Sequence, residues 1–298
     1  MLCECGPEAL EALKGAIVVL PAVTYANVGE LAVDVLVATL KPQHLGAVES
    51  VNVLSVVGND AYDPDPSLSP PQPGRLTTAL ELFKVPGRAL AFLQQRAPAM
   101  LGRQAAFAAE LVGWLVEAGV AGLVLLTGLD AQLRKDQQLD SSQLRFWASN
   151  EELRDACAAA QLRGQPSPQL IEQQPELSPL QQSSFALELE PEIKAEELEL
   201  HHSLPPWPLV QQCEARGLPY VLLGCFSAEG DNAGEGMRLA AAALQVLAAI
   251  RAPAPSAAAE ALGTEEGLLG LPANAAFPLR APPSWVGLYG RSFPMEIF

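Results

Sequence analysis

Residues 27–29 are the first place where the sequence could support ligand chemistry. Asn27 and Gly29 follow a short apolar run and open a helical pattern, so the backbone amides at this helix start could hold an anion. A structural role competes with this interpretation, because Asn27 is a common N-cap residue and Gly29 would allow a helix to pack closely on a sheet. A single glycine is a weak signal for an anion site, and the structural role is therefore favoured.

Residues 229–232, with the sequence Glu-Gly-Asp-Asn, form a second candidate site directly after a predicted strand. In α/β proteins ligands bind at the carboxyl edge of the sheet, which makes this the best place for a small-molecule site. Asp231 and Asn232 also precede a predicted helix, where such residues commonly cap the first turn, and Gly230 suits a turn. Capping is therefore favoured over ligand binding here as well.

The sequence lacks the motifs of most enzyme classes. It has no phosphate loop ending in Gly-Lys-Ser/Thr, no dinucleotide-binding GxGxxG turn, no GxSxG nucleophile elbow and no paired CxxC motifs. Its histidines, His44, His201 and His202, lie near a predicted helix end and in an acidic segment, which predicts solvated loop residues. We expect no catalytic residue, no metal site and no cofactor.

Cysteine usage and charge limit the environment and the partners. The cysteines are odd in number and share no repeated metal-binding spacing, which predicts reduced thiols at Cys3, Cys5, Cys157, Cys213 and Cys225. The formal net charge of −16 argues against nucleic acid or an anionic membrane as a partner. Apolar stretches fall short of the ~20 residues of a membrane span, and the first residues lack the basic region of a signal peptide. We expect the protein in the cytoplasm and nucleus.

Two further segments have the composition of interaction surfaces. Residues 134–147 mix charged side chains with Phe146 and Trp147, a combination enriched at protein interfaces and equally suited to a surface loop whose aromatic side chains enter the core. The sequence finishes on Met295, Ile297 and Phe298, although chain ends normally face water. An apolar anchor beside a free carboxylate is a known mode of terminal recognition, so we expect this tail to bind a partner.

Hydrophobic patterning predicts alternating strands and helices. Residues 15–20 form a strand-length apolar run, a helix begins at Asn27 and residues 47–54 have the pattern of a strand, which together predict a βαβ unit and a parallel sheet. Residues 79–84 and 88–93 flank a Val-Pro-Gly turn and predict a hairpin. The later elements are predicted as helix 100–118, strand 120–127, helix 206–216, strand 220–225 and helix 235–250.

This alternation predicts an α/β fold with a mixed, largely parallel sheet flanked by helices, as a three-layer sandwich with loop insertions. Segments rich in Pro, Gly, Gln, Glu or Ala are expected to be loops at residues 63–74, 164–199 and 252–281. Because these segments alternate with core elements, we expect a single domain over residues 1–298. It would carry flexible insertions at 164–199 and 252–281 and a docking tail at 291–298.

Four blocks of sequence resemble the proteasome assembly chaperone 2 family. The first is residues 18–34, which begins Val-Val-Leu-Pro-Ala-Val, and the second runs from the strand at 123–127 into residues 134–146. The acidic turn at 229–232 is the third, and the last contains Pro-Ser-Trp at 283–285, Leu-Tyr-Gly at 288–290 and the chain end from Pro294. Four blocks in the right order over nearly the whole chain are far more specific than any single motif.

The resemblance implies a non-enzymatic α/β protein that forms a heterodimer with proteasome assembly chaperone 1. It further implies that the pair binds proteasome α subunits, promotes formation of the seven-membered α ring and leaves when the core particle matures. C-terminal tails of the family insert into pockets between neighbouring α subunits, which by resemblance implies docking through Met295, Ile297 and Phe298. In this sequence Glu296 and Ile297 depart from the hydrophobic-Tyr ending of many proteasome-binding tails.

Two other interpretations remain open. One is a small-ligand-binding or phosphorylase-like α/β enzyme that uses Asn27, Glu229, Asp231 and Asn232 around a pocket, and binding of nucleosides or sugars would support it. The other is a scaffold that recruits partners through its acidic segment, residues 164–199. The scaffold interpretation requires that deletion of this segment abolishes binding while truncation of the tail does not.

Overall fold

Runs of Val, Ile and Leu form the strands that make up the centre of the protein. The computed structural model describes residues 2–3, 6–62, 75–139, 141–164, 185–250 and 278–285. The strands are β1 Leu2–Cys3, β2 Ile17–Pro21, β3 Gln43–Glu49, β4 Val57–Asn59, β5 Leu76–Thr78, β6 Leu80–Lys84, β7 Leu90–Gln95, β8 Gly122–Asp130, β9 Leu144–Ala148, β10 Leu187–Glu188 and β11 Tyr220–Ser227.

Nine of these strands form one mixed sheet, in the order β1-β3-β6-β7-β2-β8-β11-β9-β10. The central strands β7, β2, β8 and β11 are parallel to one another. Antiparallel pairs lie on both sides of them, between β3, β6 and β7 on one side and between β11 and β9 on the other. Strands β4 and β5 pair separately as a two-stranded ribbon.

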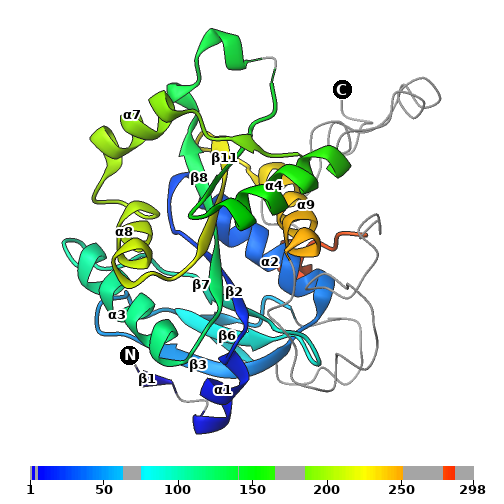
Figure 1. Ribbon diagram of the computed structural model, residues 1–298. Helices are drawn as coiled ribbons and strands as arrows, with labels where there is room; N and C mark the ends of the chain where they lie inside the picture. The colour runs from blue at the N-terminus through cyan, green and yellow to red at the C-terminus, as the bar shows by residue number, and fades with distance from the viewer. Residues whose placement is uncertain are drawn as a thin grey trace, which may run out of the picture.

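Helices cover both faces of the sheet, as Figure 1 shows. The α-helices are α1 Gly6–Leu13, α2 Val28–Leu40, α3 Gln104–Glu117, α4 Glu151–Gly164, α7 Pro191–His201, α8 Trp207–Arg216 and α9 Ala233–Ala249. Helices α2, α4 and α9 pack together on one face, and α3 and α8 pack together on the other. This arrangement confirms the predicted α/β fold of helices on both sides of a mixed sheet. None of the described helices combines the length and apolar character that a membrane span needs.

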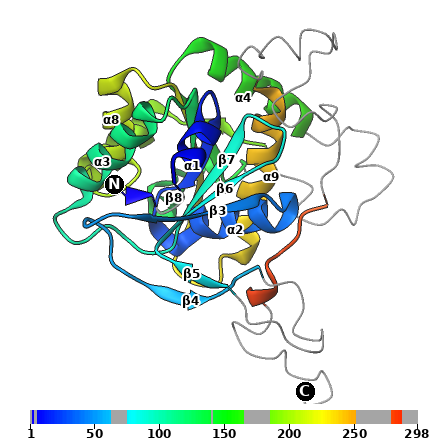
Figure 2. The ribbon, with the colours of Figure 1, turned by 90° about the horizontal axis from the view of Figure 1, so that it is seen from below.

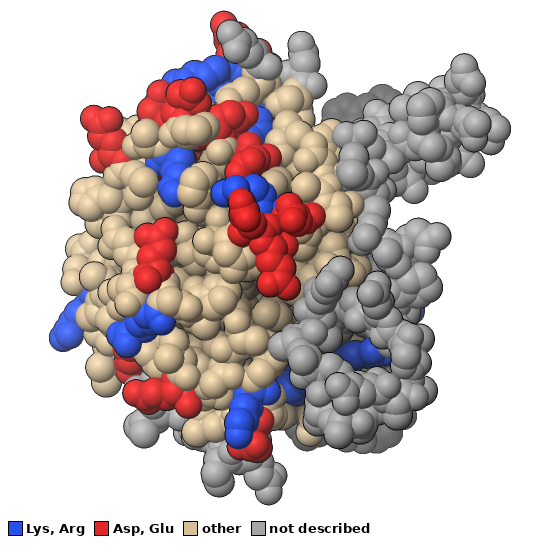
Figure 3. Space-filling model, viewed as in Figure 1, with Lys and Arg blue, Asp and Glu red and all other residues tan. Residues whose placement is uncertain are grey.

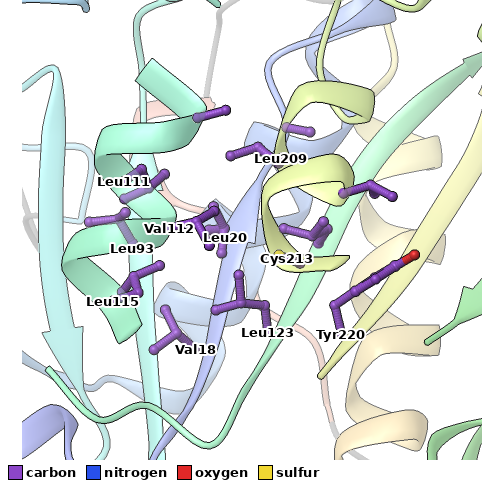
Figure 4. Close-up of a cluster of buried hydrophobic side chains, with 14 of the residues drawn as sticks. Val18, Leu20, Leu93, Leu111, Val112, Leu115, Leu123, Leu209, Cys213 and Tyr220 are labelled. Atoms are coloured by element: carbon purple, nitrogen blue, oxygen red, sulfur yellow. The ribbon is translucent and has the colours of Figure 1, made fainter. Parts of the chain in front are cut away.

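A core cluster fills the space between the sheet and helices α3 and α8. Figure 4 shows Leu111 and Leu115 of α3 and Cys213 of α8 pointing toward the strand residues Leu20 and Leu123. Each of these side chains is at most 2 % exposed. Burial of one such side chain contributes roughly 1.5–3 kcal/mol, so this layer fixes the two helices against the parallel strands.

Gly29 sets how closely helix α2 approaches the sheet. A Cβ at this position would lie 2.3 Å from the carbonyl oxygen of Leu126 in β8. The chain can therefore bring the first turn of α2 onto the sheet only with glycine here. This confirms the packing role predicted for Gly29, and it places the start of α2 at the carboxyl edge of the central strands.

The predicted hairpin and the elements after it are confirmed. Residues 80–84 and 90–95 pair as β6 and β7, and the chain then alternates through α3, β8, α8, β11 and α9 close to the predicted bounds. Strand β9 and helices α1, α4 and α7 were not predicted. These elements lack either a strong apolar period or a strong turn signal in the sequence.

The strand predicted at residues 47–54 is wrong in position. Strand β3 begins at Gln43 and ends at Glu49, and its register shifts beside Gly46, which has a φ of 148°. Polar Gln43 and His44 are tolerated because β3 lies near the edge of the sheet, with β6 as its main neighbour. Strands β2 and β3 are parallel to each other, as the βαβ prediction requires, but they are not neighbours, because the β6–β7 hairpin lies between them in the sheet.

The predicted flexible insertion at 164–199 is wrong for the part that the structure describes. Residues 187–188 form β10 beside β9, and residues 191–201 form α7. Pro191 occupies the first turn of α7 and Ile193 is fully buried against the core, which explains why this acidic segment folds. Residues 165–184 lie outside the described residues, as do residues 63–74 and 251–277. The division into one domain stays a prediction.

Candidate functional site

The carboxyl edge of the central strands brings together several segments that could carry function. Because β2, β7, β8 and β11 are parallel, the chain leaves each of them on the same edge of the sheet. Asn27 and the turn at 229–232 both follow strands of this set, as predicted. Within the described residues, no hydrogen bond or ion pair joins Asn27 to that turn.

The side chains of Asp231 and Asn232 form hydrogen bonds to the backbone of the turn at 229–232 and the residues next to it. One carboxylate oxygen of Asp231 accepts a hydrogen bond from the Ala233 amide at 3.0 Å, as in an Asx turn. The N-cap position of α9 is Asn232, whose side chain makes no capping hydrogen bond, so the capping predicted for these two residues is corrected. Asn232 is buried and donates to the carbonyl oxygens of Ala228 and Gly230 at 2.9 and 3.0 Å. Asn27 occupies the N-cap position of α2 with a φ of 53°, but its side chain makes no capping hydrogen bond.

Two of the three histidines are not solvated loop residues, which corrects the prediction. His44 lies on β3, with its Nε2 3.2 Å from Oε1 of the buried Glu81. His201 is at the end of α7, with its Nε2 2.9 Å from the Tyr25 hydroxyl and 3.7 Å from an Asp130 carboxylate oxygen. The antiparallel pair β3–β6 brings His44 to Glu81. Helix α7 brings His201 to Tyr25, which follows β2, and to Asp130 at the end of β8. His202 is exposed, as predicted.

The cysteines of the described core are reduced and buried, and burial raises the pKa of the thiols of Cys157 and Cys213 to about 12 and of Cys225 to about 11. Such thiols stay protonated at neutral pH and act as small apolar groups. Cys3 lies on β1, and Cys5 falls outside the described residues. No cluster of His, Cys, Asp and Glu suited to a metal ion occurs in the described part of the chain.

The segment at 134–147 is bound to the neighbouring part of its own chain. Arg145 is 1 % exposed, donates hydrogen bonds to both carboxylate oxygens of Glu190 at 2.8 and 3.0 Å, and lies over the ring of Phe226. Burial alone would raise the pKa of Glu190, but the hydrogen bonds and charge of Arg145, together with hydrogen bonds from the Glu190 backbone and Gln138, outweigh it and lower that pKa. Lys135 pairs with Glu196 of α7 at 2.7 Å. Of the two interpretations left open for this segment, intramolecular packing accounts for these contacts.

A buried polar network that the sequence did not predict lies between α2 and strands β6 and β7. Asp34 accepts hydrogen bonds from the Tyr62 hydroxyl at 2.5 Å, from Nε2 of Gln94 at 2.6 Å and from Arg96 at 2.8 Å. Arg96 also faces Glu81 of β6 at 3.9 Å. Burial, followed by the charge of Asp34, raises the pKa of Tyr62 well above its ordinary value. The network fixes Arg96 at the carboxyl end of β7.

A surface hollow opens beside this network. It has a volume of about 320 Å³ and is lined by Val23, Asn27, Glu30, Arg96 and Pro98. The Oε2 atom of Glu30 is buried there without a hydrogen-bond partner. Burial raises the pKa of Glu30 to about 8, and the negative charge of Asp34 one helical turn away acts in the same direction. The hollow therefore contains an acidic group that lacks a counterpart.

Exposed apolar side chains gather on the segments next to the hollow. We call this surface the apolar ridge, and it comprises Val51, Leu54, Val56, Val57, Leu76, Met100 and Leu101. Leu101 is 96 % exposed and Val51 is 81 % exposed. Figure 2 shows the β4–β5 ribbon of this ridge as a pair of strands separate from the main sheet.

Charged side chains gather elsewhere. Figure 3 shows Asp and Glu over the upper part of the face seen in Figure 1, where α7 and α4 lie. The predicted docking residues of the tail, Met295, Ile297 and Phe298, lie outside the described residues, and their role stays a prediction. No sequence signal pointed to the ridge, because its residues come from three separate segments.

Comparisons with known proteins give a consistent family. The PAC2 family matches residues 18–281. Proteasome assembly chaperone 2 of Danio rerio is 26 % identical over 291 residues, which cover 98 % of each chain. Proteasome assembly chaperone 2 of Nematostella vectensis is 29 % identical over 232 residues, which cover 76 % of this chain and 86 % of that protein.

Among solved structures, PbaA of Pyrococcus furiosus, an archaeal homologue of proteasome-assembly chaperone, is similar with a TM-score of 0.48 and 14 % identity, over 78 % of each chain. The family match covers most of the sequence, from Val18 of β2 to beyond α9. The chain therefore belongs to the PAC2 family.

Proposed function

We propose that this protein is a proteasome assembly chaperone without enzymatic activity. The observation that carries the proposal is similarity along 98 % of both chains to a relative named proteasome assembly chaperone 2. The polar residues at the carboxyl edge support it, because Asp231 and Asn232 are engaged in their own turn. Of the phosphorylase-like set, Asn27 lines the hollow, whereas Glu229, Asp231 and Asn232 are not among the residues that line it.

We propose further that the protein forms a heterodimer with proteasome assembly chaperone 1, binds α subunits and promotes formation of the α ring. A chaperone of this kind needs only to bind the incomplete ring more tightly than the finished one, because differential affinity sets when it leaves. The tail residues Met295, Ile297 and Phe298 would anchor the contact with α subunits. The exposed apolar ridge supports a protein partner, since surfaces of this kind mark interaction sites.

We place this activity in the cytoplasm and nucleus. The free, buried thiols of Cys157, Cys213 and Cys225 suit a reducing compartment. Fluorescence microscopy of the tagged chain tests this, and a signal confined to the extracellular medium, the secretory pathway or mitochondria would contradict it.

Co-purification tests the function. The full-length chain is expressed with proteasome α subunits and proteasome assembly chaperone 1, beside a variant that lacks residues 295–298 and a matched full-length variant with Ile297→Ser and Phe298→Ser. We expect the full-length chain to recover incomplete α rings and both variants to lose them. If neither change reduces the recovery of α rings, the chaperone proposal stands, but the tail is not the group that docks. If the full-length chain recovers no proteasome subunit in the presence of the partner, the chaperone proposal is wrong.

The phosphorylase-like alternative predicts binding of nucleosides or sugars at micromolar concentrations, which calorimetry of the isolated chain would detect.

A further inference from the structure

The ridge and the hollow form one continuous surface. Pro98 lines the hollow, and its carbonyl oxygen accepts a hydrogen bond from the Leu54 amide of the ridge at 3.2 Å. The adjoining Met100 amide donates to the Asn52 carbonyl oxygen at 2.8 Å, and Val53 forms a bridge with Ala99. The two ridge segments are therefore fixed to each other directly beside the hollow.

The exposed side chains of the ribbon point to the same side. In an antiparallel pair, directly opposite residues place their side chains on one face. Val57 is opposite Thr78, and Leu76 is opposite Asn59, so Val57 and Leu76 share a face while Thr77 on the other face is buried. Val57 is 71 % exposed and Leu76 is 60 % exposed. This face of the ribbon is uncharged, with Val57 and Leu76 exposed beside Asn59 and Thr78.

The ridge carries no charge in a strongly acidic protein. The sequence has neither acidic nor basic residues at 51–59, 76–80 or 97–102, although the net charge is −16. Loss of charged residues from an apolar, exposed surface is characteristic of the centre of a protein–protein interface. Large apolar interfaces also belong to permanent complexes, whereas contacts that must be released are more polar.

The hollow also indicates the charge of the partner group that would enter it. Glu30 on α2 and its neighbours Asp34 on the same helix and Glu81 on β6 are acidic, and Arg96 after β7 is the cation packed among them. Arg96 is already engaged with Asp34 and the Tyr62 hydroxyl. The Oε2 atom of Glu30 has no partner, so a cation that entered the hollow would meet an unpaired acidic group.

From these observations we infer that the apolar ridge and the hollow are the docking surface for the chaperone partner of this protein. The partner would cover the ridge with an uncharged apolar surface and insert one Lys or Arg side chain beside Glu30. This inference rests on the proposed function, because it names the surface that the heterodimer uses.

A second copy of this chain fits the surface less well. The ridge segments contain no Lys or Arg, so a symmetric pair of ridges would offer no cation of their own to Glu30. The flanking cations are also engaged, since Arg75 lies 3.6 Å from Asp60 and Arg103 donates to Asn52. Two chains with a net charge of −16 each would also repel one another.

Substitutions on the ridge test where the partner docks. The complex with proteasome assembly chaperone 1 is measured for wild type, Leu101→Asp and Val51→Asp, with Leu200→Asp on α7 as the matched control. Leu200 is 61 % exposed and lies outside the ridge. We expect each ridge variant to bind the partner at least about tenfold more weakly, a loss of roughly 1.4 kcal/mol or more, and the control to bind as wild type.

The outcomes separate this inference from the proposed function. If wild type binds the partner and the ridge variants bind equally well, the docking surface is wrong while the function stands. If the ridge variants keep the partner and lose α subunits, the ridge has a different occupant and the inference is overturned. Dissociation of a homodimer by the ridge variants, in the absence of partner, would assign the surface to a second copy. If wild type binds α subunits but no partner, the heterodimer itself is wrong.

The isosteric variant Glu30→Gln tests the cation. An inserted Lys or Arg requires ionised Glu30, so we expect the affinity of wild type for the partner to rise from pH 6.5 to 8.5. Glu30→Gln should lose that rise and bind at least about tenfold more weakly at pH 8.5. An affinity that falls over the same pH range in wild type, and not in the variant, would mean that protonated Glu30 donates to the partner, and the inserted cation would be wrong.

Discussion

The charged residues around α7 are paired within the chain, whereas the apolar residues of the ridge are exposed to solvent. We call residues 134–147 and 185–201 the charged cap. In the cap, Arg145 is buried and paired with Glu190, and Lys135 pairs with Glu196. On the ridge, Leu101 and Val51 are almost fully exposed and have no counterpart in the described part of the chain.

The difference indicates that the charged cap is stable in the isolated chain, whereas the ridge would be stabilised by a partner. A charged surface is stable in water once its buried members are paired, whereas exposed apolar area gains free energy only when another surface covers it. Acidity is the most conspicuous property of the sequence, yet the buried charge of the charged cap, Arg145, is already paired with Glu190 of the same chain. The surface that invites a partner is the uncharged one.

Removal of one member of the buried ion pair should have the largest effect on stability. Glu190→Ala leaves the guanidinium of Arg145, which is 1 % exposed, without its carboxylate. We expect the free energy of unfolding in urea to fall by about 4 kcal/mol, because an uncompensated buried charge is costly. The double variant Glu190→Ala, Arg145→Met is the control and should recover part of this loss. A loss below about 1 kcal/mol for the single variant would show that water reaches Arg145 and that the cap is not self-sufficient.

Glu30 should make the stability of the isolated chain depend on pH. Its folded-state pKa of about 8 lies above the ordinary value of 4.5, so the folded state binds the proton more tightly than the unfolded state between these values. The contribution of Glu30 to the free energy of unfolding is therefore fully present below about pH 4.5 and is lost as the pH rises toward 8. Relative to Glu30→Gln, we expect wild type to lose about 4 kcal/mol between pH 5 and 8.5 in urea unfolding. Parallel pH profiles would mean that solvent reaches Glu30 freely, and the hollow would not hold an unpaired acid.

Gly29 allows the first turn of α2 to pack on β8, which places Glu30 at the hollow. A side chain at position 29 should therefore lower the free energy of unfolding. Gly29→Ala puts a Cβ 2.3 Å from the Leu126 carbonyl oxygen, which forces α2 away from β8. We expect a loss of about 2 kcal/mol in the free energy of unfolding. Gly234→Ala in the first turn of α9 is the matched control, because a Cβ there meets nothing within 4 Å. Equal effects of the two substitutions would show that α2 can shift without cost.

The sequence predicted an element correctly where its local apolar pattern coincides with the burial of that element in the structure. The apolar runs of β2, β8 and β11 are buried throughout, so their strand character was readable, and the Val-Pro-Gly turn predicted the β6–β7 hairpin. It failed for α7, in which four of the eleven residues are acidic, because burial of Ile193 and Glu197 depends on contacts with distant segments.

The candidate site was harder to predict for the same reason. Asn27 was identified, but Glu30 and Arg96 gain their significance only when the β7 end is brought beside the first turn of α2. The ridge comes from three segments that are each too short to show an apolar period. The pairing of residues 52–54 with 98–100 and of β4 with β5 joins the three segments in space, and no local signal contains these pairings.

The smallest effect on stability should come from the ridge. Leu101 is 96 % exposed, so Leu101→Asp removes almost no buried contact from the isolated chain. We expect its free energy of unfolding to stay within about 0.5 kcal/mol of wild type, as for Leu200→Asp in the cap. A loss above about 1 kcal/mol confined to Leu101→Asp would mean that the ridge packs against its own chain.

Addition of the partner should then separate the two substitutions. A partner at one hundred times its dissociation constant stabilises the chain that it binds by about 2.7 kcal/mol. Wild type and Leu200→Asp should gain this stabilisation in thermal unfolding with proteasome assembly chaperone 1, and Leu101→Asp should gain little of it. Equal stabilisation of all three chains would place the partner elsewhere, and the exposed ridge would then not be the surface on which this protein depends.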